Sequence, residues 1–145
     1  MAAPYTYKKL SEVEDSAPRF GFGETQEARF ATGDLEAEET GVSFHRVRPG
    51  RRQGFAHKHD HAEEVYVVIA GSGRLSLDDD VLEVERLDAI RVAPHVVRAF
   101  EAGPTGSKCW PSVPAAPTTA ARCSLTGGAT ERPRPMIRSA AGGRY

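Results

Sequence analysis

The chain of 145 residues carries 19 basic and 20 acidic side chains, which gives a formal net charge of -1 and an isoelectric point near 6.5. This length is typical of one domain, and the balanced charge excludes the strong positive field that binding to nucleic acid or to an anionic membrane requires. The N-terminus lacks the apolar core of a secretory signal, and the longest apolar run, VYVVIA, is too short to cross a bilayer. We therefore expect a cytoplasmic protein that binds a small molecule or another protein.

The first 40 residues are expected to form a segment that packs on the main domain. Within it, KKLSEVEDS (8–16) predicts a helical turn that starts near Ser11, with Glu14 three residues later as a weak capping box. The apolar stripe of a longer helix is missing, so the pattern indicates no more than this turn.

Residues 41–104 are expected to form the core of the domain, because strand patterns there alternate with Gly, Pro and Asp clusters that favour turns. The expected strand segments, in chain order, are GVSFHRVRPG, EVYVVIAG, RLSL, VLEVE, DAIRVAP and HVVRAFEAG. The turns between them include Pro49-Gly50, Gly71-Ser72-Gly73 and Asp78-Asp79-Asp80. Short strands at this spacing predict an all-β sandwich or barrel.

The strand 64–70 is apolar on both of its faces. Side chains alternate along a strand, so Val65, Val67 and Ile69 share one face, and Tyr66, Val68 and Ala70 share the other. If one face lines a barrel interior, the other is covered either by the N-terminal region or by a second copy of the chain. We favour a homodimer, with cover from the same chain as the alternative.

Residues 105–145 differ in composition from the rest of the chain. Residues 101–145 hold 6 basic and 2 acidic side chains, whereas residues 1–100 hold 13 and 18. The segment is rich in Pro, Ala and Arg without apolar periodicity, which predicts a largely irregular tail. Its Cys109 and Cys123 lack Cys-x-x-Cys spacing and are expected to be free thiols.

The stretch HKHDHAEE (57–64) holds three histidines and three carboxylates directly before an apolar strand. On an extended chain His57 and His59 point the same way, and Glu64 shares the inner face with Tyr66, whereas Glu63 points outward. Two imidazoles and one carboxylate suit Fe(II), Mn, Ni or Zn and leave coordination positions open. The alternative is a solvated polar hairpin, and the residues alone do not decide between the two.

The spacing His57-x-His59-x4-Glu64-x6-Gly71 resembles the first motif of the cupin superfamily. Through residues 42–104 the chain is similar to small bacterial single-domain cupins of the conserved-barrel, RmlC-like type. The resemblance implies a double-stranded β-helix, or jelly-roll barrel, with a small-molecule site inside it. It also implies a metal on His57, His59 and Glu64, and activities of the dioxygenase, decarboxylase or isomerase kind.

The second cupin motif departs from the usual pattern, because Arg98 stands where the family has a fourth, histidine ligand. An Arg side chain donates hydrogen bonds and does not ligate a cation. Three readings follow: Arg98 binds an acidic substrate beside a three-ligand metal, neutralises Glu64 in a site without metal, or points outward. His95 is expected in an exposed turn, and His45 as a lining, core or surface histidine.

The sequence therefore predicts a cupin that binds a divalent metal through His57, His59 and Glu64 and acts on, or binds, a small molecule, with Tyr66 and Arg98 lining the pocket. The alternative is a metal-free cupin that binds an acid or a sugar through Arg98. Whether the protein is an enzyme is left open at this stage. Neither nucleic acid nor a membrane is expected as a partner.

Overall fold

The computed structural model describes residues 4–114, and the side chains of residues 4–106. Within this part of the chain two short 3-10 turns precede a set of antiparallel strands. The elements are η1 (Leu10–Glu12), η2 (Pro18–Phe20), β1 (Gln26–Phe30), β2 (Thr40–Val47), β3 (Glu64–Leu77), β4 (Asp80–Glu85), β5 (Ala89–Val92) and β6 (Arg98–Pro114). No helix within residues 4–114 is long and apolar enough to cross a membrane.

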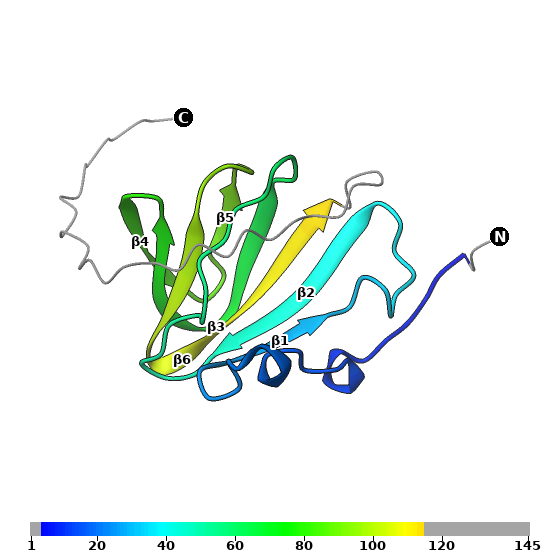
Figure 1. The fold of residues 1–145 in the computed structure, drawn as a ribbon, viewed down its shortest axis with the longest axis horizontal. Coiled ribbons are helices and arrows are strands. Elements are labelled where there is room, and N and C mark those ends of the chain that lie inside the picture. Colours follow the sequence, from blue (N-terminus) through cyan, green and yellow to red (C-terminus); the bar gives the residue numbers. More distant parts are fainter. Residues whose placement is uncertain (1–3, 115–145) are drawn as a thin grey trace.

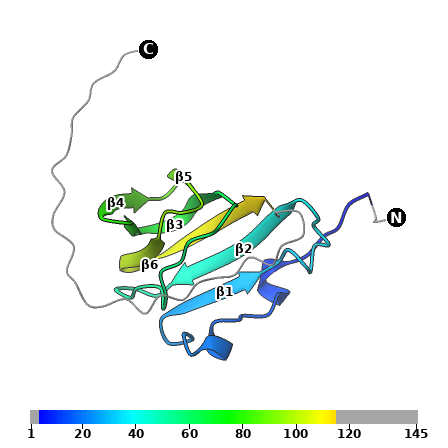
Figure 2. The ribbon, with the colours of Figure 1, turned by 45° about the horizontal axis from the view of Figure 1, so that its top comes forward.

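The strands form one sheet in the order β1-β2-β6-β3-β4, with β5 paired to the first part of β3 (Figure 1). Figure 2 shows β1, β2, β6 and β3 side by side in that order. The register between β3 and β6 shifts between Val68 and Ala70 and again between Gly71 and Gly73. Such irregularities bend a pair of strands, so the long strands can curve around a core. The all-β fold predicted from the sequence is confirmed.

The segment that follows β2 closes the sheet along the first residues of β6. Gln53 and Phe100 exchange hydrogen bonds: the Gln53 N–H donates to the Phe100 carbonyl (2.8 Å), and the Phe100 N–H donates to Oε1 of Gln53 (2.9 Å). Oε1 of Gln26 accepts from the Gly54 N–H (3.0 Å), which ties the same segment to β1. The buried amide side chains thus satisfy main-chain donors where no regular strand pairing exists.

The apolar core lies on the inner face of this curved sheet. Eight buried residues from β2, β3, β4, β5 and β6 form it: Val47, Tyr66, Val68, Leu75, Val84, Val92, Phe100 and Ala102. The predicted inner face of β3 is confirmed. Its outer face is not buried in the single chain, since Val65 and Ile69 are each 37% exposed. Cover of this face from the same chain is therefore not seen within the described residues, and the homodimer stays a prediction.

The N-terminal segment lies against β1 and not over the outer face of β3. The Asp15 carboxylate accepts from the main-chain N–H groups of Ala17 (3.0 Å) and Ala28 (2.9 Å), and Val13 is buried. The predicted turn is present as η1, but its capping box is not: the cap is Lys9 and makes no side-chain bond. A three-residue turn ends before Glu14, whose carboxylate accepts from Arg19 instead (2.8 Å).

The sheet extends past the predicted core of 41–104 at both ends. β1 lies within the segment 1–40, and β6 continues through the start of the expected irregular tail to Pro114, paired with both β2 and β3. Pairing between main chains does not require apolar periodicity, which is why a Pro-rich sequence concealed this strand. Residues 115–145 of the expected tail, with Cys123, lie outside the described part of the chain.

Gly71 and Gly73 do not end a strand as predicted, because β3 is continuous from Glu64 to Leu77. Gly71 has a φ of 79°, a conformation that favours glycine. At Gly73 an added Cβ would collide with the carbonyl oxygen of Glu101 on β6. The two glycines permit the close approach and the bend of the longest strand pair.

The substitution Gly73→Ala is expected to lower the free energy of unfolding by about 2 kcal/mol, because the main chain of β6 must move to admit the methyl group. Urea unfolding measures this difference. Gly33→Ala is the matched control, since nothing lies within 4 Å of its Cβ position, and its stability should stay within about 1 kcal/mol of the wild type. Equal stability of the two variants would contradict the close approach.

Candidate functional site

His57 and His59 are held by main-chain bonds to the segment that leads into β6. His57 and Arg98 exchange N–H···O bonds of 3.1 and 2.9 Å, and the His59 N–H donates to the Pro94 carbonyl (2.9 Å). The intervening Lys58 is exposed, whereas both histidine rings are half-buried. The alternation predicted from the sequence is therefore confirmed.

Glu64 is the first residue of β3 and is only 5% exposed, and its register partner is Val92 of β5. The neighbouring Glu63 is exposed, and its carboxylate pairs with Arg91 (2.8 Å). The choice of Glu64 as the inward carboxylate is confirmed. His61 and His95 are both exposed and take no part in the cluster.

His57, His59 and Glu64 converge, with one potential ligand atom from each within 4.8 Å of the others. Nε2 of His59 lies 3.1 Å from Oε1 of Glu64, and Nε2 of His57 lies 3.5 Å from Oε2. Two ligand atoms about 2.1 Å from a tetrahedral ion are about 3.4 Å apart, so these separations suit a shared metal.

Nε2 of His59 supports the same interpretation. This atom is buried, and among the described residues it has no hydrogen-bond partner. Its short approach to Glu64 lacks the angle of a hydrogen bond, so the contact leaves the nitrogen unsatisfied. A buried nitrogen of this kind is costly unless a further group binds it. The residues present fit a divalent metal.

Arg98 is 1% exposed and forms an ion pair with Glu64. Its Nη2 lies 2.6 Å and its Nε 2.8 Å from Oε2 of Glu64, and Nη1 donates to the carbonyl oxygens of Pro94 (3.0 Å) and Val96 (2.8 Å). The reading of Arg98 as an outward surface charge is wrong. The geometry corresponds to neutralisation of Glu64, and the guanidinium is not among the groups that line the cavity beside the cluster.

Tyr66 completes the surroundings of the carboxylate, since its hydroxyl donates to Oε2 of Glu64. Burial alone would raise the pKa of Glu64, but the contacts with His57, His59 and Tyr66 and the charge of Arg98 hold that pKa well below its usual range. Burial and the Glu64 charge raise the pKa of Tyr66 well above its ordinary value. The site therefore pairs an ionised carboxylate with a protonated phenol at neutral pH.

A cavity of about 260 Å³ adjoins the cluster, and His57, His59, Glu64 and Tyr66 lie in its wall. The remaining described lining comes from β1, β2 and the segments after them. It consists of Phe30, Thr32, Gly41, Val42, Ser43, His45, Gln53 and Phe55. Sequence reasoning did not identify Ser43 or Gln53, although strand alternation through VSFHRV places Ser43 on the same face as His45.

His45 is a lining residue that is only 8% exposed. Its Nε2 lies 3.2 Å from Oγ of Ser43, and its Nδ1 is buried without a hydrogen-bond partner among the described residues. Burial, together with the nearby His57, lowers the pKa of His45 to about 4. The imidazole is therefore neutral at neutral pH.

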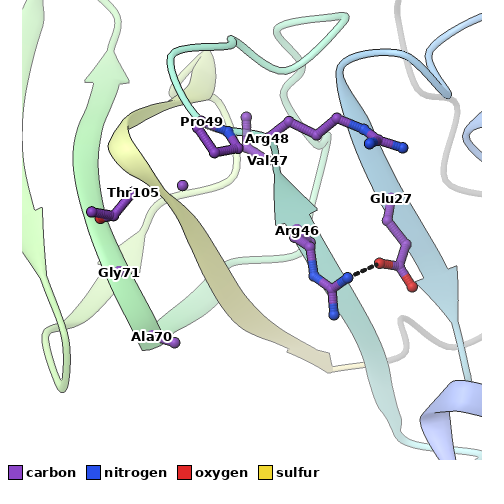
Figure 3. Close-up of a pocket in the computed structure, with 9 residues that line it drawn as sticks. Glu27, Arg46, Val47, Arg48, Pro49, Ala70, Gly71 and Thr105 are labelled. Carbon is purple, nitrogen blue, oxygen red and sulfur yellow. Dashed lines mark ion pairs between the residues drawn. The ribbon is translucent and has the colours of Figure 1, made fainter.

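A second, larger hollow of about 340 Å³ lies away from the cluster (Figure 3). Residues from β1, β2, β3 and β6 line it, and Arg46 on its wall pairs with Glu27 at 3.1 Å. None of the predicted site residues lies there. We take the smaller cavity as the candidate site although it has the lower volume, because the buried ionisable groups line it.

The low pKa of His45 makes stability depend on pH. In the unfolded chain the imidazole takes up a proton below about pH 6.5, whereas in the folded chain it does so only near pH 4. Between these values, acidification stabilises the unfolded state, so the wild type should lose free energy of unfolding relative to His45→Gln by up to about 1.4 kcal/mol per pH unit. Urea unfolding of both proteins across this range measures the difference, and parallel profiles would contradict it.

Comparison with known proteins gives a family and a fold. Residues 43–107 match a family model described as the cupin domain. No protein from the curated collections matches the chain. The identities to solved structures are low, so these structures show the fold alone.

Three of the similar solved structures cover most of the chain. A cupin protein from Bacteroides fragilis aligns with a TM-score of 0.63 at 18% identity, over 90% of this chain and 99% of that one. A polyketide cyclase from Streptomyces resistomycificus aligns with a TM-score of 0.67 at 20% identity, over 88% and 89%. A sugar phosphate isomerase of the cupin superfamily from Silicibacter pomeroyi aligns with a TM-score of 0.60 at 16% identity, over 77% of each chain. The match over residues 43–107 identifies a cupin domain in this chain, and the similar structures share its jelly-roll fold.

Proposed function

We propose that this cupin binds a divalent transition metal through His57, His59 and Glu64 and holds a small molecule in the adjoining cavity. The observation that carries the proposal is the convergence of three potential ligand atoms within 4.8 Å at the wall of a cavity. Two imidazoles and one carboxylate suit Fe, Mn, Ni or Zn. When bound, such an ion supplies Lewis-acid polarisation of a substrate carbonyl or carboxylate, or a site for oxygen.

The two oxygens of Glu64 have different roles in this proposal. Oε2 is engaged by the Tyr66 hydroxyl and by Nε and Nη2 of Arg98, whereas Oε1 faces Nε2 of His59. Oε1 is thus the oxygen left for a metal. Tyr66 acts as a positioning residue that orients the carboxylate, as groups behind a metal ligand commonly do, and Arg98 balances the carboxylate charge. Tyr66 also lies in the cavity wall, within reach of a bound molecule.

The reaction is proposed only as a class. The similar structures include a cyclase and an isomerase. One fold supports many chemistries, so this likeness does not select among them. Activity on a small molecule at a metal is the proposal that the cluster and cavity together support.

A metal-free binding protein is the second candidate, and the Arg98–Glu64 ion pair favours it. The guanidinium cancels the carboxylate charge, and an uncharged cluster attracts a cation less strongly than an anionic one. In this case the cavity would bind a small molecule without catalysing a reaction. Arg98 would then be a structural partner of Glu64, because its N–H groups already contact Glu64, Pro94 and Val96.

Metal content separates the two candidates. Protein purified without a metal-binding tag and incubated with Fe(II), Mn, Ni or Zn should retain about one ion per chain by elemental analysis, and His57→Ala/His59→Ala should retain none. The matched control is His61→Ala/His95→Ala, which removes two exposed imidazoles and should leave the metal content unchanged. A wild type that stays empty with all four metals would refute the metal site.

Replacement of Arg98 gives a second test with two opposite effects. Arg98→Met should lower the free energy of unfolding of the metal-free protein by about 3 kcal/mol, because Glu64 is left as a buried charge without its cation. The same change should strengthen Zn binding by about tenfold or more, since a positive charge beside the ligand is removed and Tyr66 still holds Oε2. Urea unfolding and calorimetric titration with Zn measure the two effects.

Arg91→Met is the control for this test, because Arg91 pairs with the exposed Glu63. Exposed pairs contribute little, so its stability should change by less than about 1 kcal/mol and its metal affinity should not change. Weaker Zn binding by Arg98→Met than by the wild type would mean that the guanidinium is required to orient Glu64.

A further inference from the structure

We propose that the cavity selects an uncharged molecule with an apolar, ring-like body and a hydroxyl or carbonyl group that hydrogen-bonds to His45. The inference rests on the proposed function in that it takes the same cavity as the ligand chamber, and it adds the chemical class of the ligand. It also replaces the acidic ligand that Arg98 suggested in the sequence.

The apolar part of the wall is built from side chains of two strands and of one connecting segment. Phe30 and Val42 come from β1 and β2, and Phe55 comes from the segment that precedes His57. The Phe55 ring centroid lies 5.6 Å from that of His57, and Phe30 meets His45 edge to face, also at 5.6 Å. Rings arranged in this way favour a flat apolar ligand over a polyhydroxylated one.

The cavity volume limits the size of the ligand. A dry cavity of about 150 Å³ holds one benzene molecule. By proportion, the volume of about 260 Å³ accepts about ten non-hydrogen atoms. A single ring with a short substituent fits this space.

The charges around the cavity argue against an acidic ligand. Among the described lining residues there is no Lys or Arg. Arg98 lies behind Glu64, where its Nε donates to that carboxylate, its Nη1 donates to two carbonyl oxygens, and its Nη2 is buried in the ion pair with Glu64. An acid in this cavity would bury its charge beside the ionised Glu64, and without a metal it would have no cation to contact.

His45 supplies the polar anchor. The neutral ring bonds Ser43 through Nε2, and its buried Nδ1 is left without a hydrogen-bond partner among the described residues. An unsatisfied buried polar atom is costly, and a hydrogen bond to a ligand hydroxyl or carbonyl removes that cost. The neutral imidazole carries one donor and one acceptor nitrogen, so it suits either group but offers no charge to an anion.

The experiment titrates benzyl alcohol, toluene and benzoate into the full chain after removal of metal with a chelator. The three probes share one aromatic ring and differ in their polar group. Chemical shifts in 1H–15N spectra give the dissociation constants. We expect benzyl alcohol to bind about fivefold more tightly than toluene, through one added hydrogen bond, and at least about tenfold more tightly than benzoate.

The variant His45→Phe keeps a ring at this position and removes its nitrogens. It should lower the affinity for benzyl alcohol about fivefold and leave the affinity for toluene unchanged. His95→Phe, at an exposed histidine, should change neither affinity. If His45→Phe does not fold, the relative affinities of the wild type for the three probes still test the proposal. Benzoate that binds the metal-free chain as tightly as benzyl alcohol overturns the proposal, as does an unchanged benzyl alcohol affinity in His45→Phe.

A Co(II) titration of the same samples distinguishes the two proposals. Metal on the cluster without the expected order of probes overturns the neutral-ligand inference and leaves the metal site intact. The expected order of probes without metal binding overturns the metal site and leaves the cavity assignment intact.

Discussion

The site depends on Arg98, because its main chain and its side chain each hold a different part. The main chain exchanges two hydrogen bonds with His57, which fixes the histidine segment against the first residue of β6. The guanidinium reaches Glu64 at the start of β3 and caps the carbonyl oxygens of Pro94 and Val96. The histidine segment and the start of β3, which are close in sequence, are thereby held to a segment that lies 34 residues beyond Glu64. Loss of this residue would disturb both the charge balance of the site and its geometry.

A buried Arg at this position changes the electrostatics of the cluster. In a site made of two imidazoles and one carboxylate, the carboxylate supplies the negative charge that favours a cation. Arg98 and Tyr66 stabilise the ionised form of Glu64, which keeps Oε1 available as a ligand. The same guanidinium charge also opposes a second cation nearby. At the proposed metal site, one fixed cation and one exchangeable cation would compete for this single carboxylate.

The lining of the cavity is largely apolar and neutral, whereas the cluster at its wall contains an ionised carboxylate. Its described lining combines aromatic and aliphatic side chains with a few neutral polar groups, and the charged partners of Glu64 stay behind the wall. His45 belongs to this neutral set because burial holds its pKa at about 4. A ligand would meet apolar walls, one unsatisfied imidazole nitrogen and the histidines of the cluster. Specificity would then come from shape and from single hydrogen bonds, with little contribution from long-range charge.

Local sequence patterns determined the strands from β2 to the start of β6 and the identity of the cluster, but they did not predict β1. Period-two alternation placed Tyr66 and Val68 inward, separated Glu64 from Glu63, and put His57 and His59 on one side, because side-chain direction in a strand follows from the backbone alone. Tertiary structure decided the rest. The continuation of β6 to Pro114, the bend at Gly71 and Gly73, the pairing of Arg98 with Glu64 and the unsatisfied nitrogen of His45 all depend on contacts between distant segments. Local sequence periodicity does not predict such contacts, because they form only between segments that folding brings together.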